Sequence, residues 1–319
     1  MDQLVVDIVV PILFLRFDFD ELEIAERTFI CKLEEPLQLA RASVKSFSRD
    51  VNGCVLSAAT HALVLEGWKI DNSGGRWNSS GVSENVRAYP LDLINTVFGA
   101  FRIVTGLPTG YAQLLLKPVG WARRYVADLP PVEGTSVRGA YPTGFDNYYW
   151  LRESLPIIDR DTALRIGTVF QRLQAVDKHA LKIALRRLNM CFLREDDEDV
   201  AIDSAIALEA LLCENDQSEI THKLSLRVGA LSPLMPSLGK TPAQAFQDIK
   251  KIYAYRSAVV HGSSAAPKKR EITTESGEKA DATQLAILYL RSVLEVLIDN
   301  PEFRDPGVID RTLLLAVRQ

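Results

Sequence analysis

The sequence predicts an α+β N-terminal region followed by an all-α helical bundle. Residues 1–155 mix short runs rich in β-branched residues with turn formers and one helical segment. From residue 161 onward, apolar residues recur in steps of three or four, the spacing of one face of a helix. A chain of 319 residues with 47% apolar content can form two domains with substantial cores. We therefore expect an α+β domain over residues 1–155 and a helical domain over residues 156–319.

The charge and the cysteine content limit which partners and ions the chain is expected to bind. A net charge of −4 and a pI of about 5.7 give the chain no global attraction to nucleic acid, so any RNA contact must be local. The cysteines show neither a CxxC motif nor partnering histidines at metal-ligand spacing, so we expect no metal and no cofactor. Scattered thiols fit a reduced, cytoplasmic setting.

The chain begins with an apolar stretch that ends at Arg16. Asp2 and Asp7 stand where a signal peptide carries basic residues, and the run is far shorter than the roughly 18 apolar residues of a membrane span. We interpret the stretch as a buried strand and expect no membrane contact.

In the first region we expect strands at residues 4–10 and 28–33 and a helix at residues 90–104. Turn formers fill residues 71–81 and 129–135, which predicts breaks in regular structure there. Residues 71–81 lack the Lys-Ser/Thr pair of a phosphate-binding loop, so we interpret them as a surface loop.

The helical region begins with one long amphipathic helix over residues 161–192, whose charges follow the order that the helix dipole favours. A second helix is expected at residues 195–212, and its first five residues, 195–199, are all acidic. Adjacent residues on a helix do not converge on one point. We therefore interpret the acidic run as a solvated helix N-terminus rather than a metal site.

Three more helices complete an expected bundle of four or five members. One covers residues 219–231. The next begins with Thr241 as N-cap and Pro242 at the first helical position, and it ends at Gly262, a typical stop. The last covers residues 281–297 and ends before an Asn-Pro pair.

Arg256 interrupts the apolar stripe of the helix that begins after Thr241. The stripe otherwise consists of Phe246, Ile249, Tyr253 and Val260. An arginine in an apolar setting needs a partner, because an uncompensated buried charge costs several kcal/mol. One interpretation is a structural ion pair with Glu209 or Glu295, each of which lies on or near an apolar stripe.

His261 follows at the end of the same helix, directly before the stop glycine. A histidine in this position interacts favourably with the helix dipole when it is protonated. An equally simple interpretation is a capping histidine that binds the last carbonyl groups of the helix.

The segment 253–262, YAYRSAVVHG, resembles the R-x4-6-H signature of HEPN domains. Residues 206–212, IALEALL, and residues 218–230, SEITHKLSLRVGA, are similar to the helices that precede this signature in the Apea-like branch of the family. The three motifs occur in the expected order. The resemblance covers roughly residues 160–300 and not the N-terminal region.

The resemblance implies a helical homodimer in which two copies of Arg256 and His261 meet across a cleft. It implies metal-independent endoribonuclease activity, in which the RNA 2′-OH attacks the adjacent phosphate and leaves a 2′,3′-cyclic phosphate. Arg256 would stabilise charge on the phosphoryl oxygens, and His261 would transfer a proton. Ser257, where many active members have Asn, Asp or His, would orient the phosphate or the histidine, and Glu209 is the second supporting residue.

The three basic residues Lys268, Lys269 and Arg270 follow the signature in a polar stretch, where they either contact RNA phosphate or are solvated surface. A microbial defence or toxin-like role is implied, with residues 1–155 sensing a trigger or restraining the nuclease, and with a regulatory protein or ligand as the partner of this region. Two alternatives stay open: a non-catalytic HEPN-like dimerisation or binding module, and a helical interaction module whose Arg-His spacing is accidental.

Overall fold

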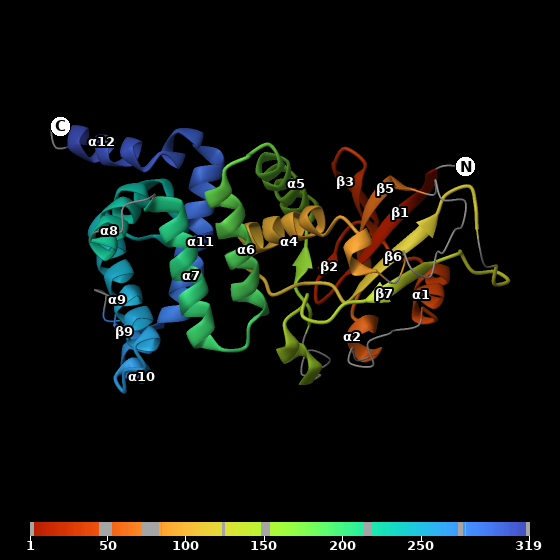
Figure 1. Cartoon of the computed structure of the whole chain (residues 1–319), viewed down its shortest axis with the longest axis horizontal. Coiled ribbons are helices and arrows are strands. Elements are labelled where there is room, and N and C mark those ends of the chain that lie inside the picture. The colour runs from red at the N-terminus through yellow and green to blue at the C-terminus, as the bar shows by residue number, and fades with distance from the viewer. Residues whose placement is uncertain are drawn as a thin grey trace. The chain divides into compact units, whose positions relative to one another are not determined.

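The computed structural model describes residues 3–44, 53–71, 83, 85–122, 125–147, 154–213, 219–273, 277 and 279–316. The chain has two compact units, one formed by Met1–Phe98 with Leu107–Gln171 and the other by Gly99–Gly106 with Arg172–Gln319. An antiparallel sheet dominates the first unit and helices dominate the second (Figure 1). The sequence therefore predicted a sheet-containing region followed by a helical region. It suggested a division between residues 155 and 156, whereas the first unit of the structure extends to Gln171.

The first unit contains a six-stranded sheet in the part of the chain that is described. Its neighbouring strands are antiparallel throughout. In spatial order they are β3 (Glu21–Ala25), β4 (Thr28–Lys32), β5 (His61–Asp71), β1 (Gln3–Ile12), β6 (Gln113–Pro118) and β7 (Glu133–Ser136). The two short strands β2 (Arg16–Phe17) and β8 (Ile157–Ile158) pair in parallel outside this sheet.

Several elements expected within residues 1–155 are confirmed. The strands expected at residues 4–10 and 28–33 are β1 and β4, and the helix at residues 90–104 is α4 (Leu91–Thr105). The break in regular structure expected at residues 129–135 is wrong for its last three residues. Strand β7 begins at Glu133 and pairs with β6, although it contains Gly134. The loop expected at residues 71–81 lies outside the described residues except for Asp71, which ends β5.

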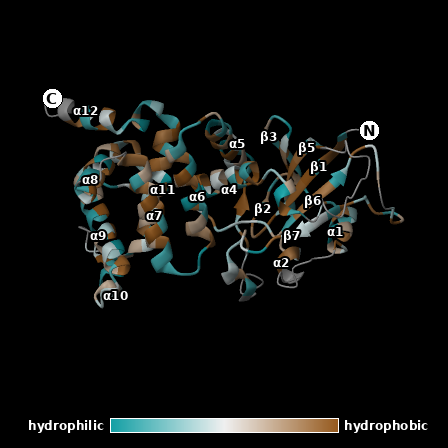
Figure 2. Ribbon diagram, in the orientation of Figure 1, coloured by the Kyte–Doolittle hydropathy of each residue, from teal (hydrophilic) through white to brown (hydrophobic). Residues whose placement is uncertain are grey.

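One core cluster of the first unit lies between the sheet and the short helices α1 (Glu35–Ala42) and α2 (Gly53–Ser57). Val9 of β1, Leu115 of β6 and Val55 of α2 belong to one cluster of buried residues. In the same cluster, the ring of Phe14 stacks on that of Phe145 with centroids 3.7 Å apart. Figure 2 shows hydrophobic residues along the central strands β1 and β5. The sequence predicted β1 as a buried strand, whereas β5 was not predicted.

Helix α5 (Arg160–Gln174) packs closely on the backbone of β3. The side-chain amide of Gln171 donates to the Ile24 carbonyl at 2.8 Å. Gly167, one turn earlier on the same face, is so close to this carbonyl that a Cβ atom there would collide with the oxygen. The glycine is therefore required by packing rather than by backbone conformation.

We expect Gly167→Ala to destabilise the chain by about 1–2 kcal/mol, because the collision outweighs the gain of roughly 1 kcal/mol that alanine brings to a helix interior. Gly144→Ala is the matched control, since a Cβ at Gly144 has no neighbour within 4 Å. Chemical denaturation of both variants tests this expectation. A Gly167→Ala variant more stable than the wild type would contradict it.

The second unit contains five long helices among its described residues. They are α6 (His179–Leu193), α7 (Asp197–Leu212), α8 (Ile220–Leu231), α9 (Pro242–Val260) and α11 (Ala282–Asp299). The shorter elements are α10 (Ala266–Arg270), α12 (Pro306–Ala316) and a hairpin of β9 (Glu271–Thr273) and β10 (Lys279–Asp281). Helix α11 contacts α6, α7, α8 and α9, and most of its side chains are buried. It is therefore the central helix of the bundle.

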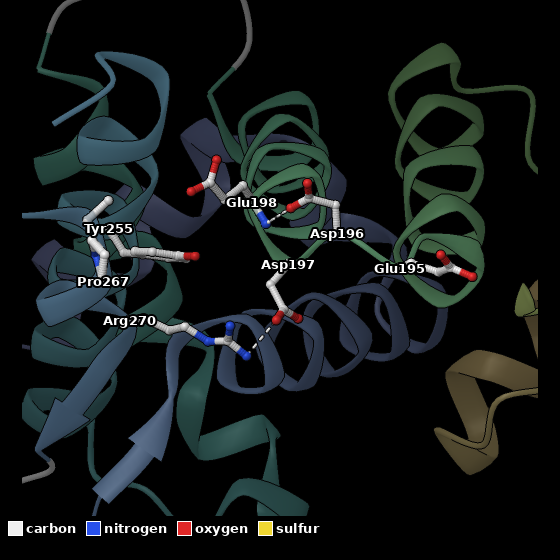
Figure 3. Close-up of a pocket in the computed structure, with 8 residues that line it drawn as sticks. Glu195, Asp196, Asp197, Glu198, Tyr255, Pro267 and Arg270 are labelled. Atoms are coloured by element: carbon white, nitrogen blue, oxygen red, sulfur yellow. Dashed lines mark hydrogen bonds and ion pairs between the residues drawn. The ribbon is translucent and has the colours of Figure 1, made fainter. Parts of the chain in front are cut away.

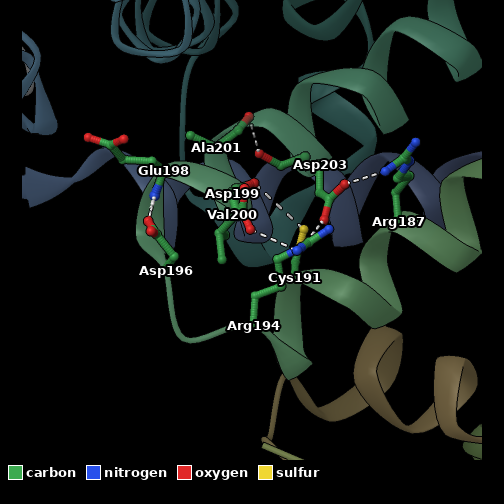
Figure 4. Close-up of polar contacts among 10 residues, drawn as sticks. Arg187, Cys191, Arg194, Asp196, Glu198, Asp199, Val200, Ala201 and Asp203 are labelled. Atoms are coloured by element: carbon green, nitrogen blue, oxygen red, sulfur yellow. Dashed lines mark hydrogen bonds and ion pairs between the residues drawn. The ribbon is translucent and has the colours of Figure 1, made fainter. Parts of the chain in front are cut away.

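Helices α6 and α7 are joined by a network of charged side chains (Figure 4). The buried Asp203 of α7 accepts from Arg187 Nη1 at 2.6 Å and from Arg194 Nε at 2.7 Å. Arg194 also contacts Asp199, which is half exposed, at 2.7 Å. Both oxygens of the buried carboxylate are thus paired with cations from the neighbouring helix and the loop after it.

Two expectations about the helical region are wrong. The single helix over residues 161–192 is two helices, α5 and α6, with non-helical residues 175–178 between them. Val176 is buried at this break, so the apolar spacing continues through it and hides the interruption. The basic residues 268–270 do not lie in an unstructured polar stretch but form the end of α10.

The remaining helix expectations are confirmed by α7, α8, α9 and α11. Asp196 caps α7 by accepting from the Glu198 amide at 2.8 Å, as expected for an acidic helix N-terminus. Among the described residues, no helix has the length and apolarity needed to span a membrane.

Candidate functional site

Local signals at both ends of α9 set the positions of the candidate residues. Thr241 and Gln244 form a reciprocal capping box, with Pro242 at the first helical position. At the other end, Gly262 adopts a positive φ of 59°, which glycine accommodates without strain. The helix therefore begins and ends where the sequence predicted, and it carries Arg256 and Ser257 in its last turns.

The buried face of α9 differs from the predicted stripe. Its buried residues are Ala245, Asp248, Ile249, Ile252, Tyr253, Tyr255 and Ala258. Val260, expected to point inward, has a relative exposure of 49%. Arg256 lies at the edge of the buried face, and its side chain is 30% exposed. The guanidinium is thus held beside the core and is open to solvent on one side.

Arg256 makes a loose contact with Glu209 of α7. The distance from Arg256 Nη2 to Glu209 Oε1 is 3.9 Å, beyond hydrogen-bond distance. The same carboxylate oxygen accepts a hydrogen bond of 2.8 Å from the Tyr253 hydroxyl. Burial, reinforced by Glu209, raises the pKa of Tyr253, so this phenol remains protonated. Glu209 is therefore bound mainly to Tyr253 and only weakly to Arg256.

Arg256 Nε is buried and has no hydrogen-bond partner within the described ranges. Of the two carboxylates considered from the sequence, Glu209 is the one that Arg256 contacts there. A guanidinium with an unpaired donor and a partner at 3.9 Å keeps most of its hydrogen-bonding capacity. It can therefore bind an additional anion.

His261 and Ser257 are both exposed near the end of α9. The backbone N–H of His261 donates to the Ser257 carbonyl at 3.1 Å, so the residue closes the last turn through its backbone. With 3.6 residues per turn, positions 256 and 261 differ by about 140° around the helix axis. One chain alone therefore directs Arg256 and His261 in different directions.

The basic triplet does not act as one surface in the structure. Arg270 Nη2 is 2.5 Å from Asp197, and Arg270 Nε is 2.6 Å from Asp281. Its charge is compensated by these two carboxylates, so it fastens α10 to α7 and α11. Lys268 and Lys269 are exposed. They are the members of the triplet that could contact phosphate.

Sequence reasoning missed a groove at the N-terminus of α7 (Figure 3). It has a volume of about 800 Å³ and includes the acidic residues 195–198, Tyr255 and Arg270. The acidic run is the signal that could have indicated it, but the partner residues come from α9 and α10, far away in sequence. In the described chain, no three His, Cys, Asp or Glu side chains are placed to hold a metal ion.

Comparisons of the chain with protein-family models, with curated proteins and with solved structures find no match. The resemblance to HEPN domains therefore stays a prediction. What the chain does has to be inferred from the chemistry of its own residues.

Proposed function

We propose that this chain is a HEPN-type, metal-independent endoribonuclease in which Arg256 binds the scissile phosphate and His261 transfers a proton. The observation that carries the proposal is the partly exposed guanidinium of Arg256, which has only a loose partner. Arg227 of the same unit provides the contrast, because it binds both oxygens of Asp310 at 2.8 and 2.6 Å. An arginine kept only for structure is expected to have such a paired geometry.

The proposed reaction needs no group beyond the side chains of the site. The ribose 2′-OH attacks the phosphorus, the bond to the 5′-oxygen breaks, and the proton lost by the 2′-OH is balanced by one gained by the leaving oxygen. Arg256 would bind the phosphoryl oxygens, where negative charge accumulates in the transition state. His261 would carry one of the two proton transfers. Ser257, exposed between them, would hydrogen-bond the phosphate.

A homodimer is part of the proposal. Arg256 and His261 of one chain diverge around the helix axis, so the α9 helix of a second chain would supply the groups missing from each side of the phosphate. Val260, exposed between them on the last turn of α9, offers apolar surface for such a contact. In this proposal the enzyme acts on RNA in the cytoplasm in a microbial defence or toxin-like role, and the sheet unit binds the regulatory protein or ligand.

The test is incubation of the purified chain with total RNA and with tRNA in EDTA, followed by analysis of fragment ends. We expect the wild type to leave 2′,3′-cyclic phosphate ends and the Arg256→Ala/His261→Ala double variant to leave the RNA intact. Cleavage by the double variant, or cleavage that EDTA abolishes, would refute the proposed site.

A second candidate is a non-catalytic HEPN-like dimerisation or binding module. The contact between Arg256 and Glu209 favours it, because this contact makes Arg256 part of the bundle's internal charge balance. In that case the chain would sediment as a dimer and cleave no RNA. Val260→Asp would then dissociate the dimer, because a carboxylate in an apolar interface is unfavourable.

A further inference from the structure

The groove at the N-terminus of α7 has the properties of a built binding site. It is open to solvent and has a volume of about 800 Å³, within the range of pockets that hold small organic ligands. Figure 3 shows acidic side chains from the start of α7 on one side and Tyr255 with Arg270 on the other. All these residues belong to the helical unit.

Tyr255 points its hydroxyl into this groove (Figure 3). Its side chain is otherwise enclosed, because the residue has a relative exposure of only 3%. Within the described part of the chain, no hydrogen bond to the hydroxyl is found. Burial raises the pKa of Tyr255, and Glu198 and Asp197 add to this effect while Arg270 opposes it. The phenol is therefore neutral at physiological pH, and it can both donate and accept a hydrogen bond.

The groove has a strong negative charge. Among its lining residues, the four carboxylates at residues 195–198 outnumber the single guanidinium, that of Arg270, by three. The positive end of the α7 dipole offsets only about half a charge. Arg270 is held by Asp197 and by Asp281, a residue that also caps α11. It therefore contributes to the wall of the groove and is not available to bind an anion.

The carboxylates follow one another along the chain and do not converge on a point. Asp196 is occupied as the cap of α7 and Asp197 by Arg270, whereas Glu198 is exposed at the edge of the groove. Charges spread in this way suit an extended ligand with several separate positive groups better than a single compact ion. The neutral Tyr255 hydroxyl at the floor of the groove can accept a hydrogen bond from an ammonium group.

We propose that this groove binds a linear oligo-ammonium ligand, with one ammonium group donating to the Tyr255 hydroxyl and the others near Glu198 and the neighbouring carboxylates. Two kinds of molecule carry several ammonium groups in a line, a free polyamine and a lysine-rich segment of a protein. The site is independent of RNA cleavage by Arg256 and His261.

Calorimetric titration of the full chain with spermidine, and separately with tetralysine, tests the proposal. We expect saturable binding of at least one of the two ligands, which weakens as ionic strength rises. Tyr255→Phe should weaken it about tenfold through loss of one hydrogen bond to a charged group. Glu198→Gln should weaken it about threefold. Glu302→Gln, which removes an exposed carboxylate outside the groove, should leave the affinity unchanged.

The outcomes are distinguishable because Tyr255→Phe retains the ring and removes a hydroxyl without a hydrogen-bond partner in the described chain, so the variant should fold. Binding of spermidine supports the site with a free polyamine as the source, and binding of tetralysine alone supports it with a protein segment. Failure of both ligands to bind overturns the proposal. Equal affinity for the wild type and Tyr255→Phe overturns it as well.

Discussion

Replacing Arg256 with alanine is expected to reduce RNA cleavage at least a hundredfold while the fold stays intact. Loss of one donor that stabilises charge in a transition state typically costs a factor of about a hundred to a thousand. The structural cost should be small, because the Glu209 contact is 3.9 Å long and the side chain is partly solvated. We expect the free energy of unfolding to fall by less than about 1 kcal/mol. Initial cleavage rates and urea denaturation measure the two effects separately.

Two controls separate the chemistry of Arg256 from its charge. Arg256→Lys keeps the positive charge but loses the planar, forked donor geometry, so it should recover only part of the cleavage rate. Lys250→Ala removes an exposed cation from the same helix and should have no effect on cleavage. The ribonuclease proposal fails if Arg256→Ala cleaves at the wild-type rate. If Arg256→Ala instead lowers the free energy of unfolding by several kcal/mol, Arg256 belongs to a structural ion pair.

The candidate residues on α9 could be predicted from the sequence because their signals are local. Thr241 and Pro242 mark the start of the helix and Gly262 marks its end, and a capping box or a left-handed glycine depends little on the rest of the chain. An arginine near an apolar stripe also predicts that a carboxylate partner is close. Glu209 was one of two choices, and the structure selects it.

The rotation of α9 depends on tertiary contacts and could not be predicted from its own sequence. Helix α9 packs against α8, α7, α10 and α11, which bury Tyr255 and Ala258 but leave Val260 exposed. A single periodic stripe describes packing against one neighbour, whereas several neighbours bury a wider arc. This is why Tyr255 was missed and the inward position of Val260 was wrong.

Long-range ion pairs were the other feature that the sequence could not reveal. Arg270 appeared to be part of a basic surface, yet it pairs with Asp197, a residue on a different helix and far away in the chain. The buried Asp203 was missed for the same reason. It lies on the buried face of α7 at helical spacing from Val200 and Ala207, and its contacts with Arg187 and Arg194 explain how a carboxylate can be buried there (Figure 4).

Asp203→Ala is expected to destabilise the chain by about 3–5 kcal/mol, the usual cost of removing one partner from a buried charge network. The Asp203 side chain is only 3% exposed, and its loss leaves the guanidinium groups of Arg187 and Arg194 without their shared carboxylate. Asp199→Ala is the matched control on the same helix, because Asp199 pairs with the same Arg194 at the surface and should cost less than about 1 kcal/mol. Chemical denaturation of the two variants tests whether the buried ion pairs of Asp203 or the surface ion pair of Asp199 contribute more to the packing of α6 on α7. Equal losses of stability in the two variants would show that the burial of Asp203 contributes nothing to the stability of the bundle. The expected difference would identify the Asp203 carboxylate as the main polar link between α6 and α7.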